Sequence, residues 1–352
     1  MSVACKPLES GTEAAWDEFV RTRPDGTFFH LSAWRHVIER AFAHRTHYIL
    51  AERDGAIVGV LPLGQVKTPL FGHSLISVPF CVYGGPLAAD AEAFAALTQH
   101  AMALMRQLGA PVLEFRFRDD HDVDGDPWTD ADGWATRSDL YVTFRKPIAG
   151  DDGENLKAIP RKQRAMVRKG IDRGLTSVID TTTPRLYRIY AESVRNLGTP
   201  VFARGFFDIL LAAFGDAADI VTILDGEEPI ASVLNFYFRD EVLPYYGGGR
   251  AIARERYGND FMYWEVMRRA AARGCRLFDF GRSKVGTGSF AFKKNWGFTG
   301  VPMHYRFHLA PGAKMPDNNP LNPKFRLMIA TWKRLPLPVA NLIGPHVVRG
   351  VG

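Results

Sequence analysis

The sequence predicts an α+β fold made of two similar halves, and three observations support this. The chain has 352 residues, more than an average single domain. Hydrophobic residues make up 46% and charged residues 23%, which is enough apolar material for a large core and too much for a disordered chain. The same order of helix, hairpin, strand, helix and strand occurs twice. The expected domains are residues 1–150 and 151–310, followed by a proline-rich appendage over 311–352.

The first half begins with two amphipathic segments. Apolar residues recur at helical spacing over 13–20 and 32–42, so helices are expected there. Two β-type runs, 47–52 and 56–62, flank an Asp-Gly pair at 54–55 that is typical of a tight hairpin turn. The later elements expected in this half are a strand over 74–82, a helix over 91–108 and a strand over 112–118.

The second half repeats this order after a Gly- and Asp-rich stretch at residues 150–153. The expected elements are helices over 183–197 and 206–214, strands over 220–224, 230–239 and 242–246, a helix over 260–273 and a strand over 276–280. A short helix over 290–296 follows and ends at a glycine. We infer a duplication from the order of elements, since the halves share no evident sequence identity.

Charge and cysteine content limit the partners and the compartment. Lys and Arg number 44 against 38 Asp and Glu, a net charge of +6 that favours anionic partners. The three cysteines are far apart and odd in number, which disfavours a disulfide framework and a zinc site. No calcium site is expected at the Asp-rich residues 119–126, which lack a distal carboxylate. The first residues lack the apolar core of a secretory signal, so a cytoplasmic location is expected.

Two further segments offer binding surfaces. A basic run on the helix expected after Pro160 could follow tRNA phosphates, an acidic polysaccharide or an anionic membrane, or it could be a solvated face. Its members are Arg161, Lys162, Arg164, Arg168, Lys169 and Arg173. Residues 335–348 are apolar, short and interrupted by prolines, so we expect a packed or surface-lying tail with at most weak peripheral membrane contact. No DNA partner is expected.

A glycine- and arginine-bearing turn precedes the helix expected at residue 260. Three glycines at 247–249 are followed by Arg250, Arg256 and Gly258. Such a turn, feeding a helix N-terminus, presents free N–H groups and the positive end of the helix dipole, which suits a phosphate. Glycine-rich turns before helices are also common in proteins without phosphate sites.

Several motifs together resemble the FemAB family of N-acyltransferases over residues 10–310. They are the repeated units, the glycine turn, Phe-Gly-Arg at 280–282 and Phe-Lys-Lys-Asn-Trp-Gly-Phe at 292–298. Val-Pro-Phe-Cys-Val-Tyr-Gly-Gly-Pro at 78–86 and Pro-Arg-Lys-Gln-Arg at 160–164 are similar to the FemAB-like proteins that accompany exosortase and PEP-CTERM systems.

The resemblance implies two tandem GNAT-like domains forming one body, with an irregular C-terminal tail. It implies transfer of an acyl or aminoacyl group to an amine of a cell-envelope or exopolysaccharide precursor, whether small molecule, glycan or peptide. No tightly bound cofactor is expected; acyl-CoA or aminoacyl-tRNA would be the co-substrate. This chain lacks the helical arm of some family members and the second small residue expected after Gly258.

Acyl transfer needs a neutral amine, so the site must offer a base, a water path or desolvation. It also needs hydrogen-bond donors for the oxyanion that forms. The candidate catalytic residues are Lys293, Asp279, Glu265 and Tyr246. The candidate donor- or substrate-binding residues are Arg250, Arg256, Gly258, Arg282, Tyr245 and Lys294. By resemblance, Lys293 would hold a donor phosphate or the developing charge.

Each assignment has a structural alternative. Asp279 could cap a turn or pair with Arg282, and Glu265 could form a surface ion pair with a neighbouring arginine three or four residues later. Tyr245 and Tyr246 point to opposite faces of a strand, so one is expected in the core. A second function class is also open, a catalytically silent protein that binds an aminosugar or peptide.

Overall fold

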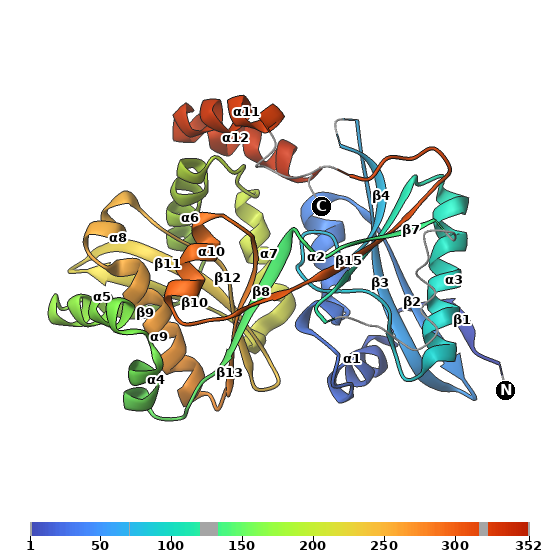
Figure 1. Ribbon diagram of the computed structural model, residues 1–352, viewed down its shortest axis with the longest axis horizontal. Helices are drawn as coiled ribbons and strands as arrows, with labels where there is room; N and C mark the ends of the chain where they lie inside the picture. The colour runs from blue at the N-terminus through green and yellow to red at the C-terminus, as the bar shows by residue number, and fades with distance from the viewer. Residues whose placement is uncertain (1, 70, 120–132, 317–322, 351–352) are drawn as a thin grey trace. The chain divides into compact units, whose positions relative to one another are not determined.

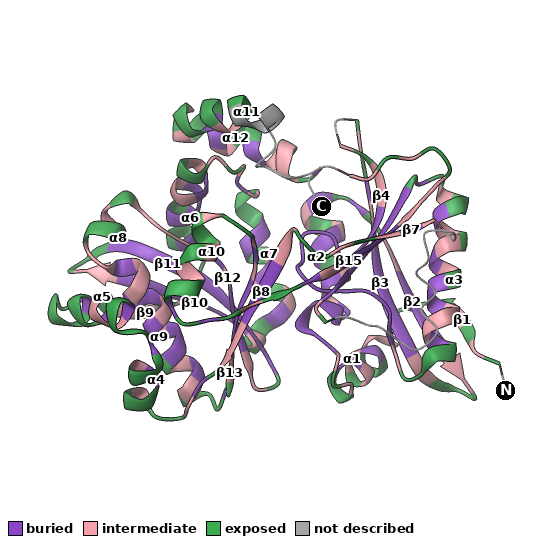
Figure 2. Ribbon diagram, in the orientation of Figure 1, coloured by how far each residue is buried: buried purple, intermediate pink, exposed green. Residues whose placement is uncertain are grey.

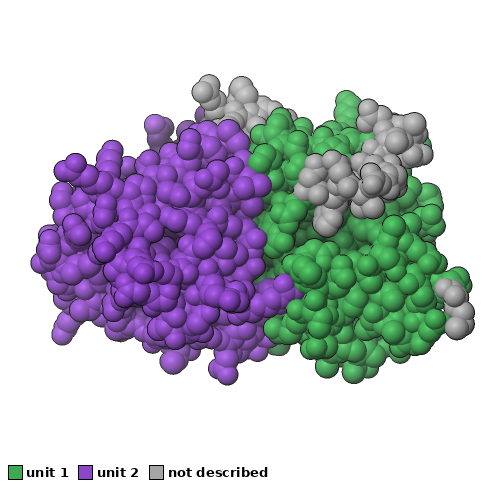
Figure 3. All heavy atoms as spheres, turned by 60° about the horizontal axis from the view of Figure 1, so that its bottom comes forward, with its two compact units in different colours: residues 1–141, 302–318, 349–352 green, residues 142–301, 319–348 purple. Residues whose placement is uncertain are grey.

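The computed structural model describes residues 2–69, 71–119, 133–316 and 323–350. The chain divides into two compact units, which Figure 3 shows in different colours. Unit 1 comprises Met1–Tyr141, Pro302–Asn318 and Arg349–Gly352. Unit 2 comprises Val142–Val301 and Asn319–Val348. Each unit contains its own mixed sheet (Figure 1).

The sheet of unit 1 has the strand order β1-β2-β3-β4-β6-β15-β7, with β5 paired to β3. Its strands are β1 (Ala4–Pro7), β2 (Arg45–Arg53), β3 (Ala56–Thr68), β4 (Gly72–Ser77), β5 (Leu87–Ala88), β6 (Val112–Phe117), β7 (Trp134–Arg137) and β15 (His304–Leu309). The hairpin of β2 and β3 turns at Asp54 and Gly55, both with positive φ, as the sequence predicts.

Helices cover both faces of this sheet. They are α1 (Glu13–Thr22), η1 (Phe28–His30), α2 (Ala33–Phe42) and α3 (Ala91–Leu108). Figure 1 shows α3 on one face and α1 and α2 on the other. Helix α3 begins where the Asp90 side chain accepts a hydrogen bond from Ala93 N and ends at Gly109, whose φ is +62°.

The sheet of unit 2 has the strand order β14-β8-β13-β12-β11-β10-β9. Its strands are β8 (Tyr141–Pro147), β9 (Thr176–Asp180), β10 (Ala218–Asp225), β11 (Glu228–Phe238), β12 (Glu241–Gly249), β13 (Leu277–Lys284) and β14 (Gly300–Pro302). Residues 229–238 of β11 are all buried, which fits a strand with helices on both of its faces (Figure 2).

The helices of unit 2 are α4 (Asp152–Ala158), α5 (Arg161–Asp172), α6 (Pro184–Leu197), α7 (Arg204–Phe214), η3 (Gly215–Ala217), α8 (Ala251–Glu255), α9 (Gly258–Ala272), α10 (Gly288–Asn295), α11 (Pro323–Arg334) and α12 (Leu337–Val348). Helices α6 and α9 both pack against β11 and β12. A Cβ added at Gly248 would meet Ser193 of α6, and one added at Gly249 would meet Asn259 of α9. Since neighbouring strand positions point to opposite faces, α6 and α9 lie on opposite sides of the sheet.

Each unit contains one parallel strand pair joined by a crossing helix. In unit 1, α3 connects β4 to β6, and the two strands pair in parallel. In unit 2, α9 connects β12 to β13, which also pair in parallel. The remaining registers described are antiparallel. The predicted α+β class with two similar halves is therefore confirmed.

The course of the chain between the units differs from the expected order. The sequence predicts one boundary at residue 150, whereas the described chain changes unit at residues 141/142 and returns to unit 1 at Pro302. The return is made by β15, which inserts between β6 and β7. The six residues of β15 form a strand, but their sequence alone does not indicate which of the two sheets the strand joins.

Three local expectations were wrong. Strand β4 ends at Ser77 instead of residue 82, since Pro79 has no N–H to donate and Phe80 has a φ of +68°. Strand β12 extends to Gly249, three residues beyond the expected end at 246, so the glycines at 247–249 pair with β11. The C-terminal tail is not irregular, because α11 and α12 occupy most of residues 323–348; the irregular segment expected over 311–323 lies partly outside the described residues.

The close packing at β12 makes a testable prediction. A Cβ at Gly248 would lie 2.5 Å from Ser193 Cβ, so Gly248→Ala should lower the free energy of unfolding by about 1 to 3 kcal/mol. Urea denaturation measures this change. The control Gly205→Ala, where nothing lies within 4 Å, should leave stability unchanged or slightly higher. Equal stability of both variants would show that the glycine is not required for packing.

Candidate functional site

The candidate site is built around β13, the strand that follows the crossing helix of unit 2. Strands β12 and β13 pair at two positions, Glu241 with Leu277 and Val242 with Phe278. Both strands then continue, β12 to Gly249 along β11 and β13 to Lys284 beside β8. The parallel ladder thus ends near the start of the two strands, and their later residues are available for other contacts.

A buried carboxylate fixes the backbone of β13 just beyond this point. Asp279 is 1% exposed, and its Oδ1 accepts a hydrogen bond of 2.7 Å from Gly281 N. Its Oδ2 lies 3.3 Å from Arg145 Nε on β8. Arg145 also bonds to Glu241 at the start of β12. Asp279 therefore holds a turn and pairs with Arg145, and this arrangement matches the capping alternative for this residue.

Lys293 lies against that turn. Its Nζ, on α10, donates hydrogen bonds to Gly281 O at 3.1 Å and to Arg282 O at 3.0 Å. Gly281 has a φ of +65°, a conformation that glycine adopts readily and that helps to present these carbonyls. The Nζ also lies 5.6 Å from the centre of the Phe144 ring and 5.8 Å from that of Phe280.

This environment changes the proton affinity of the amine. Burial disfavours the charged form and lowers the pKa of Lys293 to about 7, from an ordinary value of 10.5. The nearby Asp279 carboxylate acts in the opposite direction, and the Arg282 guanidinium lowers the pKa further. Lys293 can therefore gain or lose a proton near neutral pH. Its neighbour Lys294 has its side chain exposed to solvent.

Helix α10 is fixed at its other end by a half-buried acid, Asp260. Asp260, in the first turn of α9, accepts hydrogen bonds from Trp296 Nε1 at 3.0 Å and from Gln163 Nε2 of α5. Burial raises the pKa of Asp260, and both hydrogen bonds act to lower it. Three helices are thus connected around one carboxylate, and this holds Lys293 in position on β13.

The arginines of the glycine- and arginine-bearing turn, which were expected to bind a phosphate, are paired with carboxylates in the structure. Arg250 Nε lies 3.3 Å from Glu192 Oε2, and its NH1 bonds to Glu228. Arg256 Nε lies 3.5 Å from Asp225 Oδ2. Both guanidinium groups therefore face carboxylates of their own unit, with which a phosphate would have to compete.

Gly258 serves packing in the structure. It is buried at the start of α9, and a Cβ there would lie 2.7 Å from Ile230 Cδ1 of β11. Tyr257, the residue before it, has a φ of +63°. A glycine is required here because the helix approaches the sheet closely, which the sequence alone could not distinguish from a phosphate turn.

The two tyrosines of β12 divide as expected. Tyr246 is 6% exposed and packs among the rings of Tyr190, Phe206 and Phe207. Tyr245 is half-buried, with its ring 5.7 Å from that of Phe236. Tyr246 is thus a core residue, and Tyr245 is the more accessible of the pair.

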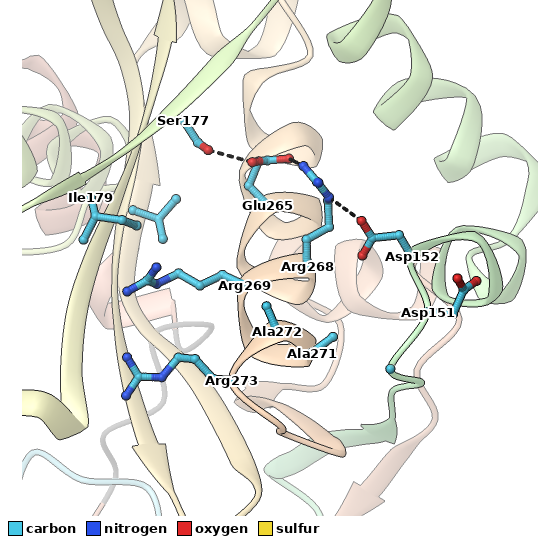
Figure 4. A pocket seen from close by; sticks show the side chains of 12 residues that line it. Asp151, Asp152, Ser177, Ile179, Glu265, Arg268, Arg269, Ala271, Ala272 and Arg273 are labelled. Carbon is cyan, nitrogen blue, oxygen red and sulfur yellow. Dashed lines mark hydrogen bonds and ion pairs between the residues drawn. The ribbon is translucent and has the colours of Figure 1, made fainter.

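Glu265 lies in a polar cavity of about 650 Å³ beside α9 (Figure 4). Its Oε2 accepts a hydrogen bond of 2.6 Å from Ser177 Oγ, and its Oε1 one of 3.0 Å from Arg268. Arg268 also forms an ion pair with Asp152, with its Nε 2.7 Å from Asp152 Oδ2. The ion pair expected from the spacing is therefore present, and Glu265 is the one member of the predicted site that lines this cavity.

The structure brings together three residues of the predicted site, Asp279, Arg282 and Lys293. The contacts described for Glu265, Tyr246 and Arg250 are with other residues. Sequence reasoning missed Arg145 and Glu241, which are 96 residues apart and meet only across the sheet. It also missed Asp219, a buried acid that bonds Asn235, Tyr237 and Arg269. Within the described ranges, no group of three or more His, Cys, Asp or Glu residues could hold a metal ion.

Comparisons with known proteins agree with the fold of the two units. Residues 161–294, all within unit 2, match the family model of the acetyltransferase (GNAT) domain. The chain is similar to a crystal structure of FemX, with a TM-score of 0.68 and 17% identity over 87% of this chain and 97% of that chain. No curated protein matches the sequence significantly.

Two further solved structures are similar. One is a tandem GNAT protein from the clavulanic acid biosynthesis pathway, with a TM-score of 0.56 and 14% identity over 89% of this chain and 100% of that chain. The other is the C-terminal domain of a putative lysylphosphatidylglycerol synthetase from Agrobacterium fabrum, with a TM-score of 0.55 and 15% identity over 85% of this chain and 92% of that chain. Residues 161–294 of unit 2 thus match a GNAT domain, and the fold of the chain is that of two tandem GNAT-like domains.

The lowered pKa of Lys293 predicts a specific pH dependence of stability. The unfolded chain keeps this proton up to about pH 10.5, whereas the folded chain loses it near 7, so the unfolded chain binds more protons between these values. Stability should therefore rise with pH, by about 2 kcal/mol from about pH 6.5 to 8.5, and this rise should be absent in Lys293→Met. Urea denaturation at several pH values measures it. The surface control Lys157→Met should keep the rise, and an equal slope in Lys293→Met would contradict the lowered pKa.

Proposed function

We propose that this protein is an N-acyltransferase that uses the β13–α10 region of unit 2 to transfer an acyl group from an anionic carrier to an amine. One observation carries the proposal: the segment matching the GNAT domain contains the strand pair that stops pairing after two residues and the lysine with a pKa near 7. The fold shared with FemX and with a tandem GNAT protein supports the same reaction class.

In the proposed reaction the neutral amine attacks the carbonyl carbon of the activated acyl group. A C–N bond forms, and the bond from the carbonyl carbon to the carrier sulfur or oxygen breaks. The amine loses a proton, and the leaving carrier group takes one. Between these events the carbonyl oxygen carries negative charge and needs hydrogen-bond donors.

Lys293 is the proposed donor to this charge. Two of its three N–H groups in the ammonium form are held by Gly281 O and Arg282 O, which leaves one for a substrate oxygen. A bound anion would raise the pKa of Lys293 and favour the ammonium form. Asp279 acts as a positioning residue through the Gly281 turn. Arg282, Tyr245 and Lys294 remain proposed substrate contacts, while Glu265 and Tyr246 would support the fold.

The proposed donor is an acyl-CoA, because the matching domain is an acetyltransferase domain. An aminoacyl-tRNA is the alternative donor, and the exposed Arg161, Lys162 and Arg168 on α5 favour it. The proposed acceptor is an amine of a cell-envelope or exopolysaccharide precursor, the class that the resemblance to FemAB-like proteins implies. An aminosugar or a peptide amine would fit this class.

A parallel assay tests the reaction class. Purified protein is incubated with acetyl-CoA and longer acyl-CoAs, and separately with charged tRNA, each with a panel of aminosugars and peptide amines. Mass spectrometry follows the loss of each ester and the gain of the amide. Product formation that RNase abolishes would identify the tRNA donor. Binding of the amines without turnover by any donor would contradict the proposal and favour the silent binding protein.

The role of Lys293 makes a kinetic prediction for the donor found active. Lys293→Met should lower kcat by about 100-fold, with a smaller effect on KM, because the donor to the transition-state charge is lost. Lys293→Arg should retain part of the rate, since it keeps a cation on α10. The matched control Lys157→Met changes an exposed lysine on α4 and should keep the wild-type rate. An unchanged kcat in a folded Lys293→Met protein would exclude this role.

A further inference from the structure

The C-terminal helices α11 and α12 expose large apolar side chains. Leu327 and Met328 of α11 are 78% and 49% exposed, and Leu342 and Ile343 of α12 are 72% and 41% exposed. With Val339, these residues account for half of the exposed large hydrophobic side chains in the described chain, and we call them the C-terminal apolar surface. Figure 2 shows exposed positions along both helices. Clustering of this kind indicates a contact surface.

Helix α12 packs on unit 2 through its smallest residues. Ala340 is 1% exposed, and Gly344, one turn later, is also buried. A Cβ added at Gly344 would lie 2.9 Å from Val201 N, so this side of the helix is tightly packed. Val339, Leu342 and Ile343 lie at helical spacing on the outer side. This distribution is the reverse of that on a helix whose apolar face covers a core.

Other contacts hold α11 on α6, and α12 also packs against α6. A Cβ at Gly198 would lie 2.6 Å from Ile329 Cγ2 of α11, and Arg195 NH1 donates to Lys333 O at 3.3 Å. Trp332 of α11 is buried. The inner faces of α11 and α12 are therefore already used within unit 2, and the C-terminal apolar surface is left for an external partner.

The charge of the segment indicates which partner fits. Residues 318–352 contain no Asp or Glu. Their basic residues are Lys324, Arg326, Lys333, Arg334 and Arg349. Lys333 and Arg334 are exposed at the end of α11. Large apolar side chains combined with cations and no anions are typical of helices that lie in the interface of an anionic membrane.

We propose that α11 and α12 dock this protein on the surface of an anionic phospholipid bilayer. The C-terminal apolar surface would enter the boundary between headgroups and acyl chains, while Lys333 and Arg334 would contact lipid phosphates. Each helix has 12 residues, and among the described helices none is both long and apolar enough to cross a bilayer. A second copy of the chain fits less well, because the two basic segments would repel each other. This proposal does not depend on the proposed acyl transfer.

Vesicle sedimentation with the full-length protein tests the proposal. We expect binding to phosphatidylcholine vesicles that contain about one third phosphatidylglycerol, and at least about tenfold weaker binding to pure phosphatidylcholine vesicles. Added salt should weaken the binding because it screens the charges. Equal binding to both vesicle types, or no binding to either, would overturn the proposal. A dimer in sedimentation velocity without vesicle binding would overturn it in favour of self-association.

Two double variants locate the contact. Leu342→Gln with Ile343→Gln removes apolar side chains, and Lys333→Glu with Arg334→Glu reverses charges; each should weaken vesicle binding by about tenfold or more. All four side chains are exposed, so thermal unfolding should hardly change.

Matched controls separate this surface from the rest of the molecule. Ile179→Gln with Val301→Gln changes two apolar residues that are 43% and 49% exposed on β9 and β14. Arg161→Glu with Lys162→Glu makes the same charge change on α5. Both controls should bind vesicles within about twofold of the wild type. A control that loses as much binding as its partner variant would show that the C-terminal helices are not the docking surface.

Discussion

The hydrogen bond from Gly281 N to the buried Asp279 carboxylate is the interaction on which the candidate site depends. It fixes the backbone where β13 has left its partner β12, and the carbonyls of Gly281 and Arg282 then hold the Lys293 amine. Helix α10, which carries Lys293, is connected to α9 through Trp296 and the half-buried Asp260. One strand and two helices are thus joined by polar contacts as well as by apolar packing.

The charged groups in this region are partly or fully buried, and each needs a partner of opposite charge to offset the loss of hydration. Asp279 is paired with Arg145, and Arg145 with Glu241, so three ionic groups of three strands satisfy one another. Arg145 and Glu241 are half-buried and Asp279 is fully buried, so removing Arg145 would leave the Asp279 charge buried without compensation. Lys293 is the group that burial disfavours most clearly, and a poorly solvated amine of this kind responds strongly to an approaching anion.

Local signals in the sequence predicted local structure well. The Asp-Gly hairpin turn and the capped helix α3 were predicted because the turn and cap residues themselves determine those conformations. The surroundings of Lys293 could be proposed because β13 and α10 are close in sequence. The pairing of Arg145 with Glu241 and the return of β15 to the first sheet could not be predicted, because the partners lie far apart along the chain. The role of the three glycines of β12 could not be predicted either, because close helix packing and phosphate binding both favour glycine.

The position of β15 affects how the protein can fold during synthesis. Strand β6 belongs to the first 117 residues, but one of its two neighbours is His304–Leu309, which the ribosome makes far later. Until then the nascent N-terminal unit exposes an open strand edge, the kind of template on which chains aggregate. Unit 2, whose sheet is complete at Pro302, can form first. Translation order and folding order are therefore reversed in part, and a chain terminated early would carry an unfinished first sheet.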